Sequence, residues 1–194
     1  METKTGATSL RLYFALWPDE NTRAALLHLQ REMRGRLVPY VNFHLTMAFL
    51  GKQPSELLPA LKELLAELPS SDITLELDRI GYFTASRIAW AGPHTVPDTL
   101  IALRKELADA LARHGVAFDD RSRFKPHITL ARDADMPSDM VFTPITWHAD
   151  QLVLVQSTTH ATGSRYEVLA RRSLQEQTRT MDERGPTASS VSAG

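Results

Sequence analysis

The chain contains one four-residue pattern twice, as HLTM at residues 44–47 and as HITL at residues 127–130. Histidine titrates near neutral pH, so one imidazole can accept a proton while another donates one. The threonine hydroxyl two residues further on can hydrogen-bond the non-bridging oxygens of a phosphate. The pattern therefore predicts acid–base chemistry at phosphorus, with His44 and His127 transferring protons and Thr46 and Thr129 binding oxygens.

Chance is a poor explanation for this repeat. The chain has seven histidines, so about one bare H-x-T is expected at random, and requiring aliphatic second and fourth residues lowers that to roughly 0.04. Two such matches have a probability of about one in a thousand. The third H-x-T, at residues 160–162, lacks the aliphatic fourth residue and is interpreted as a turn. The remaining histidines have no partner motif and are interpreted as structural or surface residues: His28, His94, His114 and His148.

Two β-strands would present these side chains on a common face. Alternate side chains of a strand share a face, so Leu45, Met47 and Phe49 are predicted to face the core. The histidines and threonines are then on the opposite face, together with Ala48 and Ala131. Two ordinary core strands would account for the aliphatic residues, but they would leave the matched polar face unexplained.

The elements around the motifs mix strands and helices along the chain. Helices are predicted over residues 19–35, 54–68 and about 98–114 from apolar residues spaced three and four apart and from capping residues. Strands are predicted over residues 11–17, 44–51, 73–83, 87–92, 127–132, 151–157 and 166–174. This order favours an α+β fold over a regular parallel α/β fold.

Composition limits the classes of protein. The chain has 194 residues, no cysteine and a net charge of −1, which excludes disulfides and thiolate sites and argues against a broad electrostatic grip on a duplex. No apolar run approaches a membrane span and no signal peptide is recognisable, so a cytoplasmic protein is expected. Residues 1–175 are predicted to form one domain, and residues 176–194 a disordered tail.

At the two motifs the sequence resembles the 2H phosphoesterase superfamily, and within it the RNA 2′,3′-cyclic phosphodiesterases, also called the 2′-5′ RNA ligase family. The resemblance covers roughly residues 10–174. RLVPYVNFHLTMAFLG is similar to the first family signature and ARHGVAFDDRSRFKPHITLAR to the second. RLYFALWP, GYFTASRIAWAGP and QSTTHATGSRYEVLARRSL resemble the opening strand, the middle hairpin and the closing strands. The departures, at Tyr40, Val41 and Met47, do not touch the expected catalytic face.

The resemblance implies two pseudo-symmetric lobes around a central cleft, each an antiparallel sheet with outer helices. It implies hydrolysis of RNA 2′,3′-cyclic phosphate ends to 2′-phosphomonoesters, without metal or cofactor. His127 would be the proton acceptor that activates water, and His44 the proton donor to the departing 3′ oxygen. Thr46 and Thr129 would bind the phosphoryl oxygens.

Two further residues and several alternative functions stay open. Arg132 could add a charged donor at the mouth of the cleft or be a solvated strand-end arginine. Phe14 could line a base pocket or be a buried strand aromatic. The same site could instead join RNA ends through a 2′-5′ linkage or hydrolyse other small cyclic phosphates or 2′-5′ oligonucleotides. A module that binds RNA ends without turnover is the non-enzymatic alternative. A monomer without membrane contact is expected.

Overall fold

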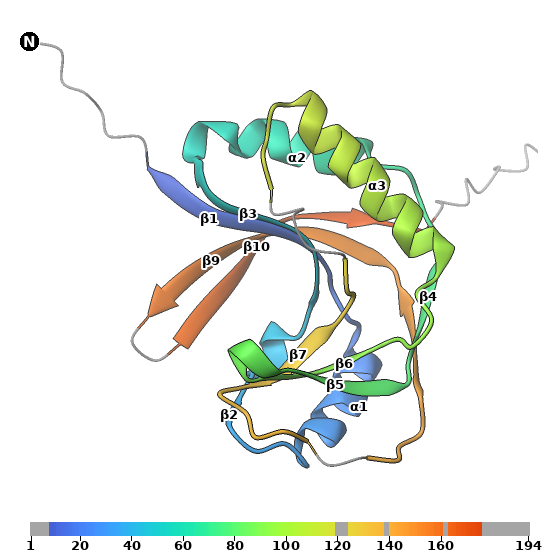
Figure 1. Ribbon diagram of the computed structural model, residues 1–194. Helices are drawn as coiled ribbons and strands as arrows, with labels where there is room; N and C mark the ends of the chain where they lie inside the picture. Colours follow the sequence, from blue (N-terminus) through green and yellow to red (C-terminus); the bar gives the residue numbers. More distant parts are fainter. Residues whose placement is uncertain (1–7, 119–123, 138–139, 161–162, 176–194) are drawn as a thin grey trace, which may run out of the picture.

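The computed structural model describes residues 8–118, 124–137, 140–160 and 163–175 (Figure 1). Its main element is an antiparallel sheet of long and short strands. The strand order is β10-β9-β1-β3-β7-β6-β5, and the short strand β2 pairs with β7. The predicted tail at 176–194 lies outside the described residues, and the domain boundary at residue 175 stays a prediction.

The main sheet consists of two halves that meet at one residue pair. The first half contains β1 (Ser9–Leu16), β3 (Leu45–Pro54), β9 (Gln151–His160) and β10 (Gly163–Ser173). The second contains β2 (Arg36–Leu37), β5 (Arg79–Phe83), β6 (Ile88–Gly92) and β7 (Ile128–Arg132). The halves join where Leu45 of β3 pairs with Ile128 of β7. Each motif strand therefore belongs to its own half, and the two strands touch where the motifs begin.

The predicted strand over residues 73–83 is wrong in one respect, because it is two strands in different sheets. β4 (Ile73–Leu77) pairs with β8 (Ile145–Ala149) in a separate two-stranded sheet, whereas β5 pairs with β6 as the predicted hairpin. Asp78 separates them, and its side chain accepts a hydrogen bond from the backbone N–H of His94 at 2.7 Å. Aspartate is disfavoured in strands, and this capping contact gives it another role. β8 was not anticipated from the sequence.

The helices cross between the two halves. α1 (Glu20–Gln30) follows β1 but packs against β7 and β8, and α3 (Asp98–Arg113) precedes β7 but packs against β3. α2 (Leu58–Glu67) contacts β9 and β10, and Figure 1 shows it beside α3 over the first half. Each half of the sheet is thus covered in part by a helix whose neighbouring strand in the chain belongs to the other half of the sheet. This crossing fixes the two motif strands relative to each other. The α+β prediction is confirmed.

The helix ends follow local sequence signals. Asp19 caps α1, because its carboxylate accepts the backbone N–H of Thr22 at 2.9 Å. The helix ends at Gln30, earlier than the predicted residue 35. At the end of α3, Gly115 adopts a φ of +66°, which glycine takes without a steric penalty. No helix of the described segments has the length and apolar character that a membrane crossing requires.

Both motif strands contain a β-bulge at the fourth motif residue. Phe14 pairs with Ala48 and Ala15 with Thr46, so Met47 is the extra residue in β3. In the same way Ala89 pairs with Ala131 and Trp90 with Thr129, which leaves Leu130 as the extra residue in β7. Adding one residue reverses the alternation of side chains beyond the bulge.

The bulges correct three face assignments. Ala48 is 2% exposed and Ala131 is fully buried, and both belong to the main core, although the simple alternation predicts them on the histidine face. Phe49 was predicted to face the core. It lies instead on the other side of β1–β3, where it packs with Tyr13 and Val155. The face that carries the histidines is therefore wider and more aromatic than the alternation suggests.

Candidate active site

The single pair between β3 and β7 brings the two motifs together. Leu45 and Ile128 are both fully buried in the core, so their neighbours in the chain point to the opposite face. His44, Thr46, His127 and Thr129 are all partly exposed. They surround the Leu45–Ile128 pair from both halves of the sheet, as the repeated pattern predicts.

The two imidazoles are held in the same way. The Nδ1 atom of His44 lies 2.7 Å from the carbonyl oxygen of Asn42, and Nδ1 of His127 lies 2.7 Å from the carbonyl oxygen of Lys125. A carbonyl oxygen only accepts, so each Nδ1 carries the hydrogen and donates it. In the neutral ring Nε2 is then an unprotonated acceptor, and in the charged ring it is a donor. Both rings are set for proton transfer through Nε2.

Aromatic side chains pack around each imidazole. Around His44 the ring centroids of Tyr13, Tyr166 and Trp17 lie at 4.9, 5.2 and 6.1 Å. Around His127 those of Phe83 and Trp90 lie at 5.0 and 6.0 Å. These rings restrict the rotation of both imidazoles and remove water from their flanks.

Burial controls the charge of both histidines. Burial lowers the pKa of His44 to about 4, although the hydrogen bond to Asn42 raises it and the positive charges of His127 and Arg132 lower it further. Burial also lowers the pKa of His127, and Lys125 adds to this effect. Both shifts favour the neutral form of the rings at neutral pH, whereas the sequence alone suggests one neutral and one charged ring. A phosphate anion raises both values by attraction.

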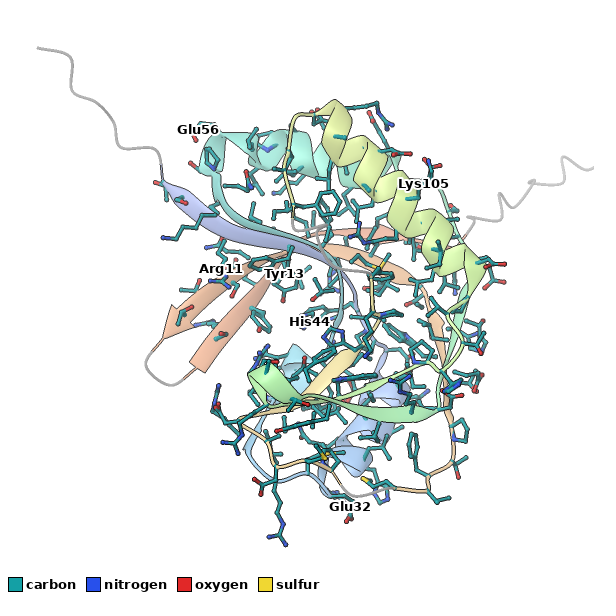
Figure 2. All side chains as sticks on the ribbon, in the orientation of Figure 1. Arg11, Tyr13, Glu32, His44, Glu56 and Lys105 are labelled. Atoms are coloured by element: carbon teal, nitrogen blue, oxygen red, sulfur yellow. The ribbon has the colours of Figure 1, made fainter. Side chains whose placement is uncertain are left out.

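A cavity of about 320 Å³ opens from His44 and Thr46 toward the β9–β10 hairpin, and we call it the hairpin cavity. Figure 2 shows Arg11 and Tyr13 near the base of this hairpin and His44 between the two halves of the sheet. The other residues that line the hairpin cavity supply positive charge, aromatic surface and hydroxyl groups: Arg11, Tyr13, Arg36, Phe49, Arg132, Ser157, Thr159, Ser164 and Tyr166.

Arg132, which the sequence leaves as either a charged donor at the cleft mouth or a solvated strand-end arginine, lies in the wall of the hairpin cavity. It pairs across the strands with Arg36, and Arg36 forms an exposed ion pair with Asp133 at 3.2 Å. A surface pair of this kind contributes little to stability. The strand pairing places two guanidinium groups on one side of the histidines.

Phe14 does not line the site: the base-pocket interpretation is wrong, and the alternative, a buried strand aromatic, is what the structure shows. Phe14 is fully buried in the main core with Leu12 and Leu16. The neighbouring residue Tyr13 faces the cleft, where it contacts His44. The signal was available in the sequence, since period two along β1 puts Tyr13, Ala15 and Trp17 on one face, but choosing the face required the partner strands.

A second cavity lies on the His127 side, and we call it the Trp90 cavity. It measures about 370 Å³ and is lined by aromatic and basic residues that include Arg79, Trp90, His94, Phe124 and Lys125. The ammonium group of Lys125 lies 5.0 Å from the ring centroid of Trp90, and the guanidinium of Arg79 lies 5.2 Å from it. His94, interpreted from the sequence as structural or surface, therefore borders a cavity next to His127.

The other histidines without a partner motif lie elsewhere. His28, His114 and His148 are exposed, and none of them lines either cavity beside the motifs. The third H-x-T begins at His160, the last residue of β9, and its other two residues lie outside the described residues. Within the described part of the chain, no group of three or more His, Asp or Glu side chains is placed to hold a metal ion.

Comparison with known proteins places this arrangement in a family. The model of the 2′-5′ RNA ligase superfamily matches residues 17–161, which include both motifs. The chain belongs to the 2′-5′ RNA ligase superfamily. Curated relatives carry the name RNA 2′,3′-cyclic phosphodiesterase, among them proteins of Escherichia coli and Thermus thermophilus. The Escherichia coli protein is 38% identical over 64% of this chain and 72% of its own length. The Thermus thermophilus protein is 33% identical over 91% of this chain and 96% of its own.

Solved structures of the superfamily share the fold. Escherichia coli LigT in its apo form aligns with a TM-score of 0.74 and 31% identity, covering 85% of this chain and 97% of LigT. A Thermus thermophilus structure aligns with a TM-score of 0.72 and 31% identity, covering 85% and 98%. The superfamily match thus extends over the lobes that carry both histidines, and the resemblance noted from the motifs is confirmed.

Proposed function

We propose that this protein hydrolyses RNA 2′,3′-cyclic phosphate ends to 2′-phosphomonoesters without a metal ion. The observation that carries the proposal is the pair of imidazoles, one from each half of the sheet, whose Nδ1 atoms donate to Asn42 and Lys125 at 2.7 Å. The names of the relatives at 38% and 33% identity support the choice of substrate. LigT has also been solved in complex with 3′-AMP.

In the proposed reaction, Nε2 of His127 takes a proton from water as the water oxygen attacks phosphorus. The bond from phosphorus to the 3′ oxygen breaks, and protonated Nε2 of His44 gives its proton to that oxygen. His127 ends protonated and His44 neutral, so exchange with solvent restores both rings. The phosphate remains on the 2′ oxygen. The assignment of His127 as base and His44 as acid follows from the family resemblance. The two rings are held alike, so their geometry does not distinguish the two roles.

Thr46 and Thr129 would donate their hydroxyl hydrogens to the non-bridging oxygens and hold phosphorus between the rings. Arg132, in the wall of the hairpin cavity, would add a positive charge near those oxygens. Hydrogen bonds to charged oxygens are stronger than neutral ones, and charge on the oxygens grows as the nucleophile adds. These groups would therefore stabilise the transition state more than the ground state.

The deciding experiment is a product assay on an oligonucleotide with a 2′,3′-cyclic phosphate end, in the presence of a chelator. We expect a 2′-phosphomonoester, resolved from the 3′ isomer by chromatography, at a rate that the chelator does not change. Binding of the oligonucleotide without product would instead support a module that recognises RNA ends. Loss of activity in chelator that is restored by a divalent metal would contradict the metal-independent mechanism.

The Trp90 cavity favours a second candidate function, the joining of RNA ends. Its aromatic and basic lining adjoins His127, the side from which water attacks in the proposed reaction. A nucleoside held there could present its 5′-hydroxyl in place of water and form a 2′-5′ linkage. Adding an oligonucleotide with a 5′-hydroxyl to the assay tests this, because a longer product resistant to 3′-5′-specific nucleases reports ligation.

We also propose that the enzyme works as a monomer in the cytoplasm. Strands β3 and β7 of the same sheet meet at the Leu45–Ile128 pair, where the two motifs begin, so the proposed chemistry needs no residue from a second copy. Activity per molecule that is independent of enzyme concentration, together with a monomeric mass in solution, is the expected result. Cell fractionation tests the location.

A further inference from the structure

The helix α1 buries two long polar side chains on one of its faces. Arg23 is 5% exposed and Gln30 is 3% exposed, and they are seven positions apart, which is about two helical turns. Arginine and glutamine are mostly found on protein surfaces, and a buried donor needs a hydrogen-bond partner. The partners of these two side chains therefore show what the helix holds in place.

Gln30 fastens α1 to the second motif. Its side-chain nitrogen donates to the carbonyl oxygen of Leu130 at 2.7 Å and to that of Val38 at 2.8 Å. Leu130 is the last residue of the second motif and the extra residue of the bulge in β7. These bonds fix the position of α1 relative to the strand that follows His127.

Arg23 fastens the same helix to the segments on either side of it in the chain. Its Nε donates to the carbonyl oxygen of Pro18 at 2.9 Å, and its Nη1 donates to that of Tyr40 at 2.8 Å. Tyr40 begins the 3₁₀ turn Tyr40–Asn42, and its carbonyl oxygen also accepts the N–H of Phe43 at 3.3 Å. The planar guanidinium thus joins the end of β1 to the turn before β3 through donors in a fixed geometry.

This turn ends at the residue that orients His44. Asn42 is the last residue of the turn, and its carbonyl oxygen accepts the hydrogen bond from Nδ1 of His44 at 2.7 Å. The turn is only three residues long, so a bond that fixes its first carbonyl group also restricts its last one. Arg23 therefore acts on the imidazole through the backbone.

Arg23 also reaches His44 through an aromatic ring. Its guanidinium lies 5.0 Å from the ring centroid of Trp17. The indole of Trp17 is stacked on the imidazole of His44, with 6.1 Å between the ring centroids and 17° between the ring planes. Trp17 directly precedes Pro18, whose carbonyl oxygen Arg23 also binds. Cation–π attraction and this hydrogen bond together hold the indole against His44.

The charge of Arg23 acts on the same imidazole. Arg23 forms no ion pair within the described residues, and its buried Nη2 has no hydrogen-bond partner among them. Burial lowers the pKa of His44 most, and the positive charges of His127, Arg132 and Arg23 lower it further. A lower pKa makes protonated His44 a stronger acid toward the departing oxygen. The other titratable side chains against His44 are two phenols, those of Tyr13 and Tyr166.

We propose that Arg23 is a positioning residue of the reaction, which holds the imidazole of His44 in its working orientation through the Trp17 ring and the turn before β3. This inference rests on the proposed function. Arg23 lines neither cavity beside the motifs, so it acts through His44 and not on the substrate. Since α1 is also tied to the second motif, the same contacts set the position of His44 relative to His127.

The first test is kinetic and uses cytidine 2′,3′-cyclic phosphate. Arg23→Gln should lower kcat about 10- to 100-fold, because a small misplacement of a reacting group has an effect of this size. KM should stay near the wild-type value, since Arg23 lines neither cavity. Arg23→Lys keeps the charge but lacks the planar fork that reaches both carbonyl groups, so it should recover only part of the loss.

The second test observes His44 itself and needs no turnover. Histidine NMR gives the pKa and the tautomer of the ring, and the His44 signal is identified by its loss in His44→Gln. In Arg23→Gln this signal should titrate at higher pH than in the wild type, because a nearby positive charge is gone, and both neutral tautomers should be present. In Arg23→Lys the titration should stay closer to that of the wild type.

Arg172→Gln is the matched control. Arg172 is a partly buried arginine that also donates to a backbone carbonyl group, that of Leu68 at 2.9 Å, and it lines neither cavity beside the motifs. This variant should keep the wild-type kcat and His44 titration, whatever stability it loses. An equal loss of kcat in Arg23→Gln and Arg172→Gln would show that general destabilisation is the cause and would overturn the proposal.

The outcomes separate this inference from the function on which it rests. A wild type that hydrolyses no cyclic phosphate would overturn the proposed function, whereas the NMR comparison does not depend on activity. A folded Arg23→Gln variant, as judged by thermal melting, in which His44 keeps its wild-type titration and tautomer would overturn the positioning role.

If Arg23→Gln does not fold, Trp17→Leu provides the decision at a half-buried residue. Removal of the indole admits water to the imidazole, and burial is what lowers the pKa of His44 most. We therefore expect a lower kcat and a His44 signal that titrates at higher pH. Wild-type values of both in Trp17→Leu would overturn the proposal.

Discussion

His44 and His127 make the same hydrogen bond, from Nδ1 to the carbonyl oxygen two residues earlier in the chain, at 2.7 Å in both cases. The acceptors are Asn42 and Lys125, each three residues before the first residue of its motif strand, Leu45 of β3 and Ile128 of β7. Because the donor atom and the chain offset are equal, local backbone geometry orients the two rings in the same way, and the surrounding aromatic rings restrict their rotation. The sheet has only to bring the strands together, and a single residue pair achieves this.

Replacing either histidine tests their roles directly. His44→Ala and His127→Ala should each lower kcat for a nucleoside 2′,3′-cyclic phosphate by about 10²- to 10⁴-fold, the usual range for a lost acid or base. The exposed His148 gives a matched control, and His148→Ala should retain wild-type kcat. Steady-state kinetics with folded variants provides the measurement. Near-normal turnover by either motif variant would rule out the mechanism.

The threonines are expected to act through their hydroxyl groups. Thr46→Val and Thr129→Val keep the shape of the side chain but remove the donor, so kcat should fall about 10- to 100-fold, the size of one hydrogen bond to a charged oxygen. Thr46→Ser and Thr129→Ser restore the hydroxyl and should recover most of the rate. If the serine variants were as slow as the valine variants, the threonines would act by packing instead.

The pH optimum of kcat/KM should lie below 6.5. This parameter reports the free enzyme, which must have a neutral His127 and a protonated His44. The optimum lies midway between the two pKa values, and burial lowers both of them, that of His44 to about 4. In the complex the phosphate anion raises both pKa values, so the optimum of kcat should lie at higher pH. A pH–rate profile for each parameter measures this, and an optimum of kcat/KM above 7 would contradict it.

Stability should decrease as the pH falls through the range from 6.5 to 4. The unfolded His44 binds a proton near its ordinary pKa of 6.5, but the folded one does so only near 4. Over that interval the unfolded state binds more protons, so the free energy of unfolding falls with falling pH, by about 3 kcal/mol in all for this residue.

His44→Gln removes that titration and provides the comparison. Urea unfolding at pH 7 and at pH 4.5 should show a smaller loss of stability for His44→Gln than for the wild type. Other groups titrate in both proteins, so the difference between the two pH dependences isolates His44. Equal pH dependence would mean that the folded and unfolded pKa values of His44 coincide.

The sequence predicted which motif residues share a face better than it predicted the walls around them. His44, Thr46, His127 and Thr129 could be assigned to one face from strand alternation, because that rule applies up to the fourth motif residue. It fails beyond Met47 and Leu130, where bulges interrupt the pairing. A bulge depends on the register of the partner strand, and no local pattern in the motif signals it.

The same reason explains the error at Phe14. Both Phe14 and Tyr13 suit a buried strand, and the sequence of β1 does not say which face the core occupies. The pairing of β1 with β9 and β3 decides it, and those strands are distant in the chain. Likewise, the cavity walls combine β1, β3, β7 and the β9–β10 hairpin, so their charge pattern emerges only after folding.

Packing around Trp90 gives a last prediction, on the His127 side of the cleft. Trp90 is 1% exposed and pairs across the strands with Gly81, and a Cβ at Gly81 would overlap the six-membered ring of the indole. Gly81→Ala should therefore destabilise the protein by about 1–3 kcal/mol, the range for overpacking. That corresponds to about 2–4 °C in melting temperature for each kcal/mol. Activity should fall too, because the indole lies 6.0 Å from the imidazole of His127.

Trp90→Phe in the same chain separates overlap from other causes. Phenylalanine lacks much of the ring that meets the new Cβ, so the double variant should be more stable than the sum of the two single effects predicts. The coupling free energy from this cycle, measured by urea unfolding, should be at least about 0.5 kcal/mol in the stabilising direction. Strict additivity would show that Gly81 is required for its backbone, not for the space that Trp90 occupies beside His127.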